Sequence, residues 1–142
     1  MTSMNPFRIS RITNDGVPGR HAALLWWDTE PERIGPAAMK IFQDPQNTLY
    51  VSHASVWELA IKLRLKKLNL SAALDAWLLD SVRENGFSLL PISLDAIMKT
   101  QDLPLHHGDP FDRILIAQAV IGDWPVLSSD AQWDAYPVRR IW

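Results

Sequence analysis

The chain has 142 residues, 47% hydrophobic and 21% charged, which is enough for one globular domain with a sizeable core. Its net charge of −2 gives no bulk sign of a nucleic-acid or membrane binder, so a nucleic-acid substrate would need local basic patches. Cysteine is absent, which excludes disulfides and thiolate chemistry and fits a cytoplasmic location. The longest uncharged apolar run, residues 114–122, is far shorter than the roughly 20 residues that span a bilayer, so we expect no membrane segment.

The N-terminal part of the chain begins with a polar segment. Residues 1–19 contain two prolines and two glycines, and we expect them to be poorly ordered or to form an edge element. The apolar run at residues 21–27 predicts a buried helix. A second short helix is expected over residues 36–42, so that the two helices form a hairpin.

A β-prone run at residues 48–52 follows a turn and predicts the first clear strand. The helix after it contains Ser55 and Glu58, which are spaced as an S-x-x-E capping box. Another amphipathic helix is expected over residues 70–85, with Ser71 at its start. Strand and helix therefore begin to alternate at this point.

The same alternation continues to the end of the chain. Residues 87–92 predict a strand, and Pro91 places it at a sheet edge or ends it there. A short helix is expected over residues 93–101. Two more strands are expected over residues 125–128 and 137–141. This order predicts an α/β fold with three layers, a central and mostly parallel sheet with helices on both faces, in a single domain spanning residues 1–142.

The stretch HHGDPFDRILIAQAV at residues 106–120 places two carboxylates ahead of the most apolar helical run. Asp109 before Pro110 is typical of a helix start, because Asp is a good N-cap and proline suits the first helical position. Asp112 then falls in the first turn, where the helix dipole favours negative charge. These two acids are either helix caps or part of a site that the buried helix holds rigidly.

Four acidic residues are expected at the carboxyl ends of the strands, where parallel α/β sheets bind ligands. They are Glu58, Asp109, Asp112 and Asp130. Several carboxylates without cysteine suit a hard cation such as Mg²⁺ or Mn²⁺, and this arrangement predicts metal-assisted hydrolysis of a phosphodiester. Taken singly, Glu58 also fits a cap or a partner of Lys62, and Asp130 fits an N-cap.

Basic and aromatic residues give weaker indications. A cluster of Lys62, Arg64, Lys66 and Lys67 follows Glu58 on its helix and either meets phosphates near the acids or forms a solvated helix end. Seven tryptophans exceed what a core of this size easily buries, so some are expected at an interface.

Several segments together carry a family resemblance. They are ALLWW at residues 23–27, YVSHASVWELAIK at residues 50–62, GFSLLPIS at residues 86–93, LPLHHGDPFDRILIAQA at residues 103–119 and VLSSD at residues 126–130. In these segments the chain resembles the VapC-type PIN-domain toxins. The resemblance covers the chain from about residue 23 to its last residue.

The resemblance implies a Mg²⁺- or Mn²⁺-dependent endoribonuclease that cleaves RNA as the toxin of a toxin–antitoxin pair. Such toxins are usually homodimers and are silenced by a small VapB-like antitoxin bound near the site. Three acids match the family's second, third and fourth metal-binding acids: Glu58, Asp112 and Asp130. Asp109 matches an additional acid of the DPFDR motif. The resemblance also points to supporting positions around the site, and these are Ser52, Ser128, Lys62 and Arg113.

The N-terminus departs from the family pattern. Relatives begin with a short apolar strand that ends in an Asp, the first metal ligand, whereas here the aligned position is Arg20. Asp15 is the only upstream acid, and its use would require a four-residue insertion. Residues 1–20 are therefore atypical, and an arginine at the ligand position would weaken metal binding. The alternative function is a catalytically impaired PIN fold that binds an antitoxin or dimerises.

Overall fold

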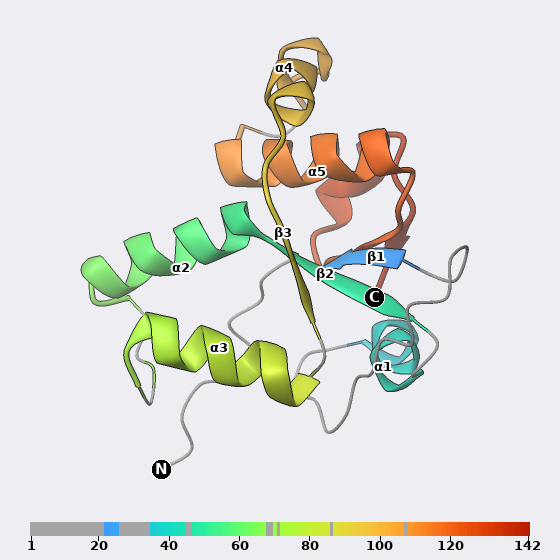
Figure 1. Ribbon diagram of the computed structural model, residues 1–142. Helices are drawn as coiled ribbons and strands as arrows, with labels where there is room; N and C mark the ends of the chain where they lie inside the picture. Colours follow the sequence, from blue (N-terminus) through green and yellow to red (C-terminus); the bar gives the residue numbers. More distant parts are fainter. Residues whose placement is uncertain are drawn as a thin grey trace.

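The computed structural model describes residues 22–25, 35–44, 47–67, 70, 72–85, 87–106 and 108–142. Its centre is a five-stranded sheet with the order β3-β2-β1-β4-β5, in which every pairing is parallel (Figure 1). The strands are β1 (Ala22–Leu25), β2 (Thr48–Ser52), β3 (Ser88–Leu90), β4 (Val126–Leu127) and β5 (Arg140–Ile141). The predicted parallel sheet is therefore confirmed.

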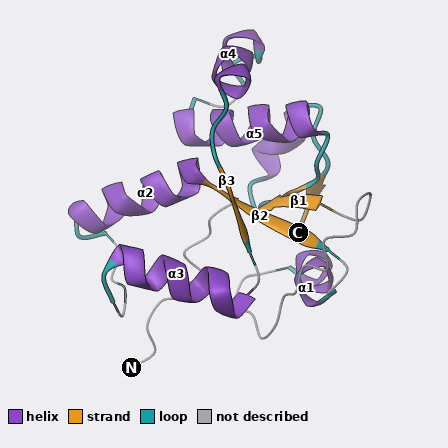
Figure 2. Ribbon diagram, viewed as in Figure 1, coloured by secondary structure: helices purple, strands orange, loops and turns teal. Residues whose placement is uncertain are grey.

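Helices connect these strands and lie on both sides of the sheet (Figure 2). They are α1 (Pro36–Gln43), α2 (His53–Arg64), α3 (Leu74–Asn85), α4 (Leu94–Asp102), α5 (Pro110–Gly122) and the 3₁₀ helix η2 (Ala131–Ala135). No helix of the described part of the chain is long and apolar enough to cross a membrane.

Alternating side chains of the strands form two separate cores. Leu49 and Val51 of β2 belong to the core under α1, α2 and α3, whereas Tyr50 packs against the core under α4 and α5. In β4, Leu127 enters the first core and Val126 enters the second. Since successive residues of a strand point to opposite faces, both faces of the sheet are covered. This is the predicted three-layer arrangement.

The prediction of a helix over residues 21–27 is wrong, because Ala22–Leu25 forms strand β1 in the middle of the sheet. Its backbone pairs with β2 on one side and with β4 on the other. Periodicity does not distinguish a short apolar run in a buried helix from one in a central strand, and here the pairing on both sides decides. The expected helical hairpin is therefore absent among the described residues, and only its second helix, α1, forms. The expectation for residues 1–20 lies outside the described part.

Helix boundaries agree with the sequence in most places and differ at α2. The N-cap of α2 is Ser52, whose Oγ accepts a hydrogen bond from the Ala54 amide at 3.0 Å. The predicted capping box at Ser55 and Glu58 is wrong, since Ser55 lies buried inside the helix. Strand β2 runs directly into α2, so the last strand residue is available as the cap. The predicted cap Ser71 lies outside the described residues, and α3 begins at Leu74.

The remaining strand predictions hold with shorter bounds. Strand β3 lies at the sheet edge, as Pro91 predicted, and pairs only with β2. Helix α4 begins after Ser93, whose Oγ accepts a hydrogen bond from the Ala96 amide at 3.1 Å. The last two predicted strands are confirmed as β4 and β5. The C-terminal residue Trp142 packs at the start of α1, where its carbonyl oxygen accepts hydrogen bonds from two amides of the first helical turn.

Candidate active site

Asp109 and Asp112 open helix α5. The Asp109 carboxylate accepts hydrogen bonds from the Phe111 amide at 2.8 Å and from the Asp112 amide at 3.4 Å, and Pro110 occupies the first helical position. The predicted N-cap is thus confirmed. Asp112 lies in the first turn and is only 5% exposed. An ionised carboxylate is costly at such a position unless positive charge or donors compensate it, which makes Asp112 a candidate functional group.

Glu58 lies on α2, which packs against α5. Burial raises the pKa of its carboxyl group, and the negative charges of Asp109 and Asp112 raise it further, while Lys62 acts in the opposite direction. Lys62 follows Glu58 at i+4 on the same helix, which is a favourable orientation for a pair. Three of the four predicted acids, Glu58, Asp109 and Asp112, therefore lie near enough for the charges of the two aspartates to affect Glu58.

An open pocket of about 440 Å³ lies beside two of these acids. Glu58 and Asp109 line it together with two lysines, Lys62 and Lys67. The remaining lining residues are Ile61, Leu65, Gly108, Pro110 and Phe111. The pocket thus combines carboxylates, which bind cations, with ammonium groups, which bind phosphate.

A buried hydrogen bond joins the two helices that carry the acids. The Ser52 Oγ, at the end of β2, donates to the Gln118 Oε1 on α5 at 2.6 Å. The side-chain Nε2 of Gln118 in turn donates to the carbonyl oxygen of Pro91, after β3, at 3.2 Å. The expected supporting role of Ser52 thus has a structural basis. Gln118 was not predicted, and a polar residue in the otherwise apolar run of α5 was the signal for it.

Asp130 follows strand β4 and caps the 3₁₀ helix η2. Its carboxylate accepts a hydrogen bond from the Gln132 amide at 2.9 Å, and its own amide donates to the Ser128 Oγ at 3.1 Å. The predicted N-cap role is confirmed. The sheet order separates the ends of β2 and β4 by β1 alone.

The predicted acids do not form a metal site within the part of the chain that the structure describes. Among the residues that the structure describes, no three His, Asp or Glu side chains are grouped so that they could hold one metal ion. The expected convergence of Glu58, Asp112 and Asp130 on one ion is therefore not seen within that part of the chain. Arg20 and Asp15, the two candidates for the position of the first family acid, lie outside the described residues.

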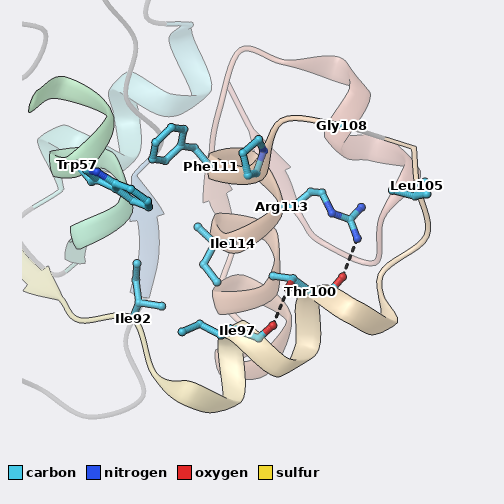
Figure 3. A pocket seen from close by; sticks show the side chains of 10 residues that line it. Trp57, Ile92, Ile97, Thr100, Leu105, Gly108, Phe111, Arg113 and Ile114 are labelled. Atoms are coloured by element: carbon cyan, nitrogen blue, oxygen red, sulfur yellow. Dashed lines mark hydrogen bonds between the residues drawn. The ribbon is translucent and has the colours of Figure 1, made fainter. Parts of the chain in front are cut away.

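A second pocket, also of about 440 Å³, lies on the other side of Phe111 and is mostly apolar (Figure 3). Trp57 and Phe111 line it, with ring centroids 5.0 Å apart in an edge-to-face contact. Ile97 and Leu105 also line it, and they are 49% and 85% exposed. Trp57 itself is 61% exposed, which confirms an exposed tryptophan on this face. Apolar surface of this kind is typical of protein contacts.

Comparison with known proteins places this arrangement in a family. The family model for the PIN domain matches residues 22–138. The chain belongs to the PIN-domain family. This PIN domain is similar to Ribonuclease VapC22 of Mycobacterium tuberculosis, with 28% identity over 108 residues, which are 74% of this chain and 79% of that protein.

The fold of this PIN domain is also found in a solved structure. That structure is the crystal structure of VapBC2 from Rickettsia felis bound to a DNA fragment from their promoter. The TM-score is 0.63, and the match covers 84% of this chain and 98% of that chain. At 10% identity the likeness extends to the fold alone.

Proposed function

We propose that this PIN domain is a divalent-metal-dependent endoribonuclease and the toxin of a type II toxin–antitoxin pair. The observation that carries the proposal is the pocket lined by Glu58 and Asp109, with the buried Asp112 in the first turn of the same helix, in a chain of the PIN-domain family. The similarity to a protein named as a VapC ribonuclease supports RNA as the substrate. Lys62 and Lys67, which share the pocket with Glu58, are suited to bind the phosphates of the substrate.

The carboxylate oxygens of these acids are of the kind that binds a hard cation. Glu58 and Asp112 supply carboxylate oxygens. Burial raises the pKa of Glu58, the nearby charges of Asp109 and Asp112 raise it further, and a bound cation would favour its ionised form. We assign Glu58 and Asp112 as ligands of Mg²⁺ or Mn²⁺, with Asp130 as a further ligand and Asp109 as a helix cap with a secondary role. When bound, the ion would activate water and stabilise the charge that develops on the phosphate.

The residues around the ion have separate tasks. Burial of Asp112 fixes its carboxylate on the first turn of α5, and the Ser52–Gln118 hydrogen bond fixes α2 against α5. Ser128 holds the backbone at Asp130. Lys62 lowers the pKa of Glu58 and so favours the ionised form that can bind a cation.

The proposed partners are a VapB-like antitoxin and a second copy of the chain. The exposed apolar residues of α2 and α4 support a protein partner on that face. They are Trp57, Ile61, Leu65, Leu94, Ile97 and Met98. Trp57, Ile61 and Leu65 are four residues apart along α2 and therefore form one stripe.

The second candidate function is a PIN fold that binds an antitoxin or dimerises without cleaving RNA. Two observations favour it. The described residues contain no group of three possible metal ligands, and the apolar face on α2 and α4 is exposed. In that case Asp109 would serve only as the N-cap of α5, and Glu58 would serve only as a charged partner of Lys62.

Cleavage of an RNA panel with Mg²⁺, with Mn²⁺ and with a chelator tests the enzyme. We expect metal-dependent cleavage that Asp112→Asn lowers by at least about 100-fold, because loss of a direct ligand should exceed the roughly 10–100-fold effect of losing a residue that only supports a ligand. Asp75→Asn, at an exposed acid in the first turn of α3, is the matched control and should cleave as the wild type does. Equal cleavage by wild type and Asp112→Asn would contradict the proposal.

Two further measurements separate the alternatives. Asp15→Asn tests whether that residue supplies the first acid, and a loss comparable to that of Asp112→Asn would assign it. Absence of cleavage together with a stable complex with the product of an adjacent small gene would favour the non-catalytic module.

A further inference from the structure

The guanidinium group of Arg113 is directed at the end of helix α4 rather than at the acidic pocket. Its Nη2 donates to the carbonyl oxygen of Thr100 at 2.6 Å (Figure 3). Nη2 also donates to the Leu103 carbonyl oxygen at 3.0 Å, and Nη1 donates to that of Pro104 at 2.9 Å. Thr100 lies in the last turn of α4, whose carbonyls lack helical partners, and Leu103 and Pro104 follow the helix directly. The arginine therefore caps α4, where the helix dipole favours positive charge.

Tyr136, in the C-terminal part of the chain, forms hydrogen bonds with the loop between α4 and α5 (residues 103–109). Its hydroxyl donates to the Pro104 carbonyl at 2.7 Å and accepts from the His106 amide at 3.1 Å. It also accepts a longer hydrogen bond from Arg113 Nη1 at 3.4 Å. The Tyr136 side chain is buried and packs edge to face against His106, with ring centroids 5.3 Å apart. Both side chains bond to Pro104, Arg113 also bonds to Thr100 and Leu103 before it, and Tyr136 also bonds to His106 after it.

The loop held in this way ends at Asp109, on the same helical turn as Arg113. The backbone amide of Arg113 donates to the Asp109 carbonyl oxygen at 3.0 Å. The loop is thus fixed at its start by the Arg113 side chain and at its end by the Arg113 backbone. Gly108 and Asp109, the last residues of this segment, line the pocket that contains Glu58.

We propose that Arg113 and Tyr136 form a clamp that positions Asp109 and the first turn of α5 against Glu58. Arg113 is then a positioning residue, and its guanidinium group does not contact RNA. The inference deepens the proposed function, since it assigns what holds the acidic pocket in shape. It rests on that function only for the effect on cleavage, because the clamp itself can be measured without substrate.

The planar fork of arginine explains why this residue type is required. Its Nη1 and Nη2 reach different carbonyl oxygens at the same time, on Pro104 and on Thr100 and Leu103. Lysine carries the same charge on a single nitrogen and does not reproduce this geometry. Arg113→Lys therefore keeps the charge and removes the clamp.

The first test is amide hydrogen exchange in wild type, Arg113→Lys and Tyr136→Phe. The informative amides are those of Phe111 and Asp112, which donate to the Asp109 carboxylate, and that of His106, which donates to Tyr136. We expect exchange of the Phe111 and Asp112 amides to rise about 10-fold or more in Arg113→Lys and less in Tyr136→Phe, with α3 unchanged. The His106 amide, which loses its acceptor in Tyr136→Phe, should exchange faster in that variant. Wild-type exchange at these amides in both variants would overturn the clamp.

A matched control is available at the C-terminal end of α5. Arg139 also donates through Nη2 to a carbonyl oxygen at a helix end, that of Asp123 after α5, at 3.1 Å. Arg139→Lys should leave exchange at the α5 N-terminus unchanged. A similar increase in this control would show that any loosened cap disturbs the loop and would contradict a specific role of Arg113.

The second test separates positioning from RNA contact. A positioning role predicts that Arg113→Lys lowers kcat about 10-fold, with KM and the salt dependence of KM unchanged. An arginine that binds a phosphate would instead change KM and its salt dependence, and that result would overturn the proposal. If the wild type cleaves no RNA, the proposed function fails, and hydrogen exchange alone then tests whether Arg113 and Tyr136 form the clamp. Should Arg113→Lys not fold, the same measurements on Tyr136→Phe decide.

Discussion

Ser52→Ala removes two interactions at once, although it changes only one small side chain. Ser52 Oγ accepts the N-cap hydrogen bond of α2 from the Ala54 amide and donates to the buried Gln118 Oε1. Ser52 is fully buried and Gln118 is 6% exposed, so water cannot readily replace the lost partner. The variant therefore loses a cap and leaves a buried acceptor without its hydroxyl donor.

The expected cost follows from these two losses. Replacing a Ser N-cap by Ala costs about 1 kcal/mol of unfolding free energy. Leaving a buried polar atom without its partner costs about 1–3 kcal/mol. Ser52→Ala should therefore lower the free energy of unfolding by about 2–4 kcal/mol, a large share of the stability of a domain of this size.

Urea denaturation, monitored by tryptophan fluorescence and by circular dichroism, measures this cost. Ser93→Ala is the matched control, because Ser93 caps α4 through the Ala96 amide and is exposed. It should cost about 1 kcal/mol. The difference between the two serines then isolates the hydrogen bond to Gln118.

A double-mutant cycle with Gln118→Leu gives the decisive comparison. Once Gln118 is leucine, Ser52→Ala no longer creates an unsatisfied acceptor, so the double variant should be about 1–2 kcal/mol more stable than additivity predicts. Additive changes in unfolding free energy, together with equal destabilisation by Ser52→Ala and Ser93→Ala, would refute the conclusion that the Ser52–Gln118 hydrogen bond stabilises the contact between α2 and α5.

Three further changes have expected outcomes. Glu58→Gln, without divalent cations, should raise the free energy of unfolding by about 0.5–1 kcal/mol at neutral pH after allowance for solvent screening. Because the folded pKa of Glu58 lies above its ordinary value of 4.5, the contribution of Glu58 to stability is most favourable below pH 4.5 and is lost as pH rises through the folded pKa. The difference in unfolding free energy between Glu58→Gln and the wild type, from urea titrations at several pH values, should therefore grow as pH rises over that range. Gly35→Ala would place a Cβ 2.2 Å from the Trp142 carbonyl carbon, so it should release Trp142 from α1 and lower the melting temperature by an amount equivalent to about 1–3 kcal/mol. Gly122→Ala would place a Cβ 2.9 Å from the Trp124 indole and should change the near-ultraviolet circular dichroism of that ring, whereas an unchanged spectrum would contradict this packing.

The parts of the fold with strong local signals were predictable from sequence. Asp109 before Pro110 marks the start of α5 because capping geometry depends on neighbouring residues alone. Pro91 marks an edge strand because proline cannot donate to a second neighbour. Strand β1 was missed because its identity depends on pairing with residues from two distant parts of the chain.

In the candidate site, too, some residues were predictable from sequence and others were not. The resemblance identified Glu58 and Asp112, and the structure places them in electrostatic contact. The inward hydrogen bonds of Arg113 could not be predicted, since they depend on where the loop after α4 folds back. Gln118 was missed because its partner Ser52 is 66 residues away. Long-range hydrogen bonds leave little local pattern in a sequence.

The position of β1 has a consequence for how the protein is made. Leu24 pairs with Val126, so the sheet cannot close until nearly the whole chain has left the ribosome. At about 5–20 residues per second, β1 waits for roughly 5–20 s with one edge unpaired. During that interval the nascent chain exposes a strand edge that can pair with another chain. Slow folding through non-local contacts thus makes synthesis the stage at which a chaperone or a partner has most effect.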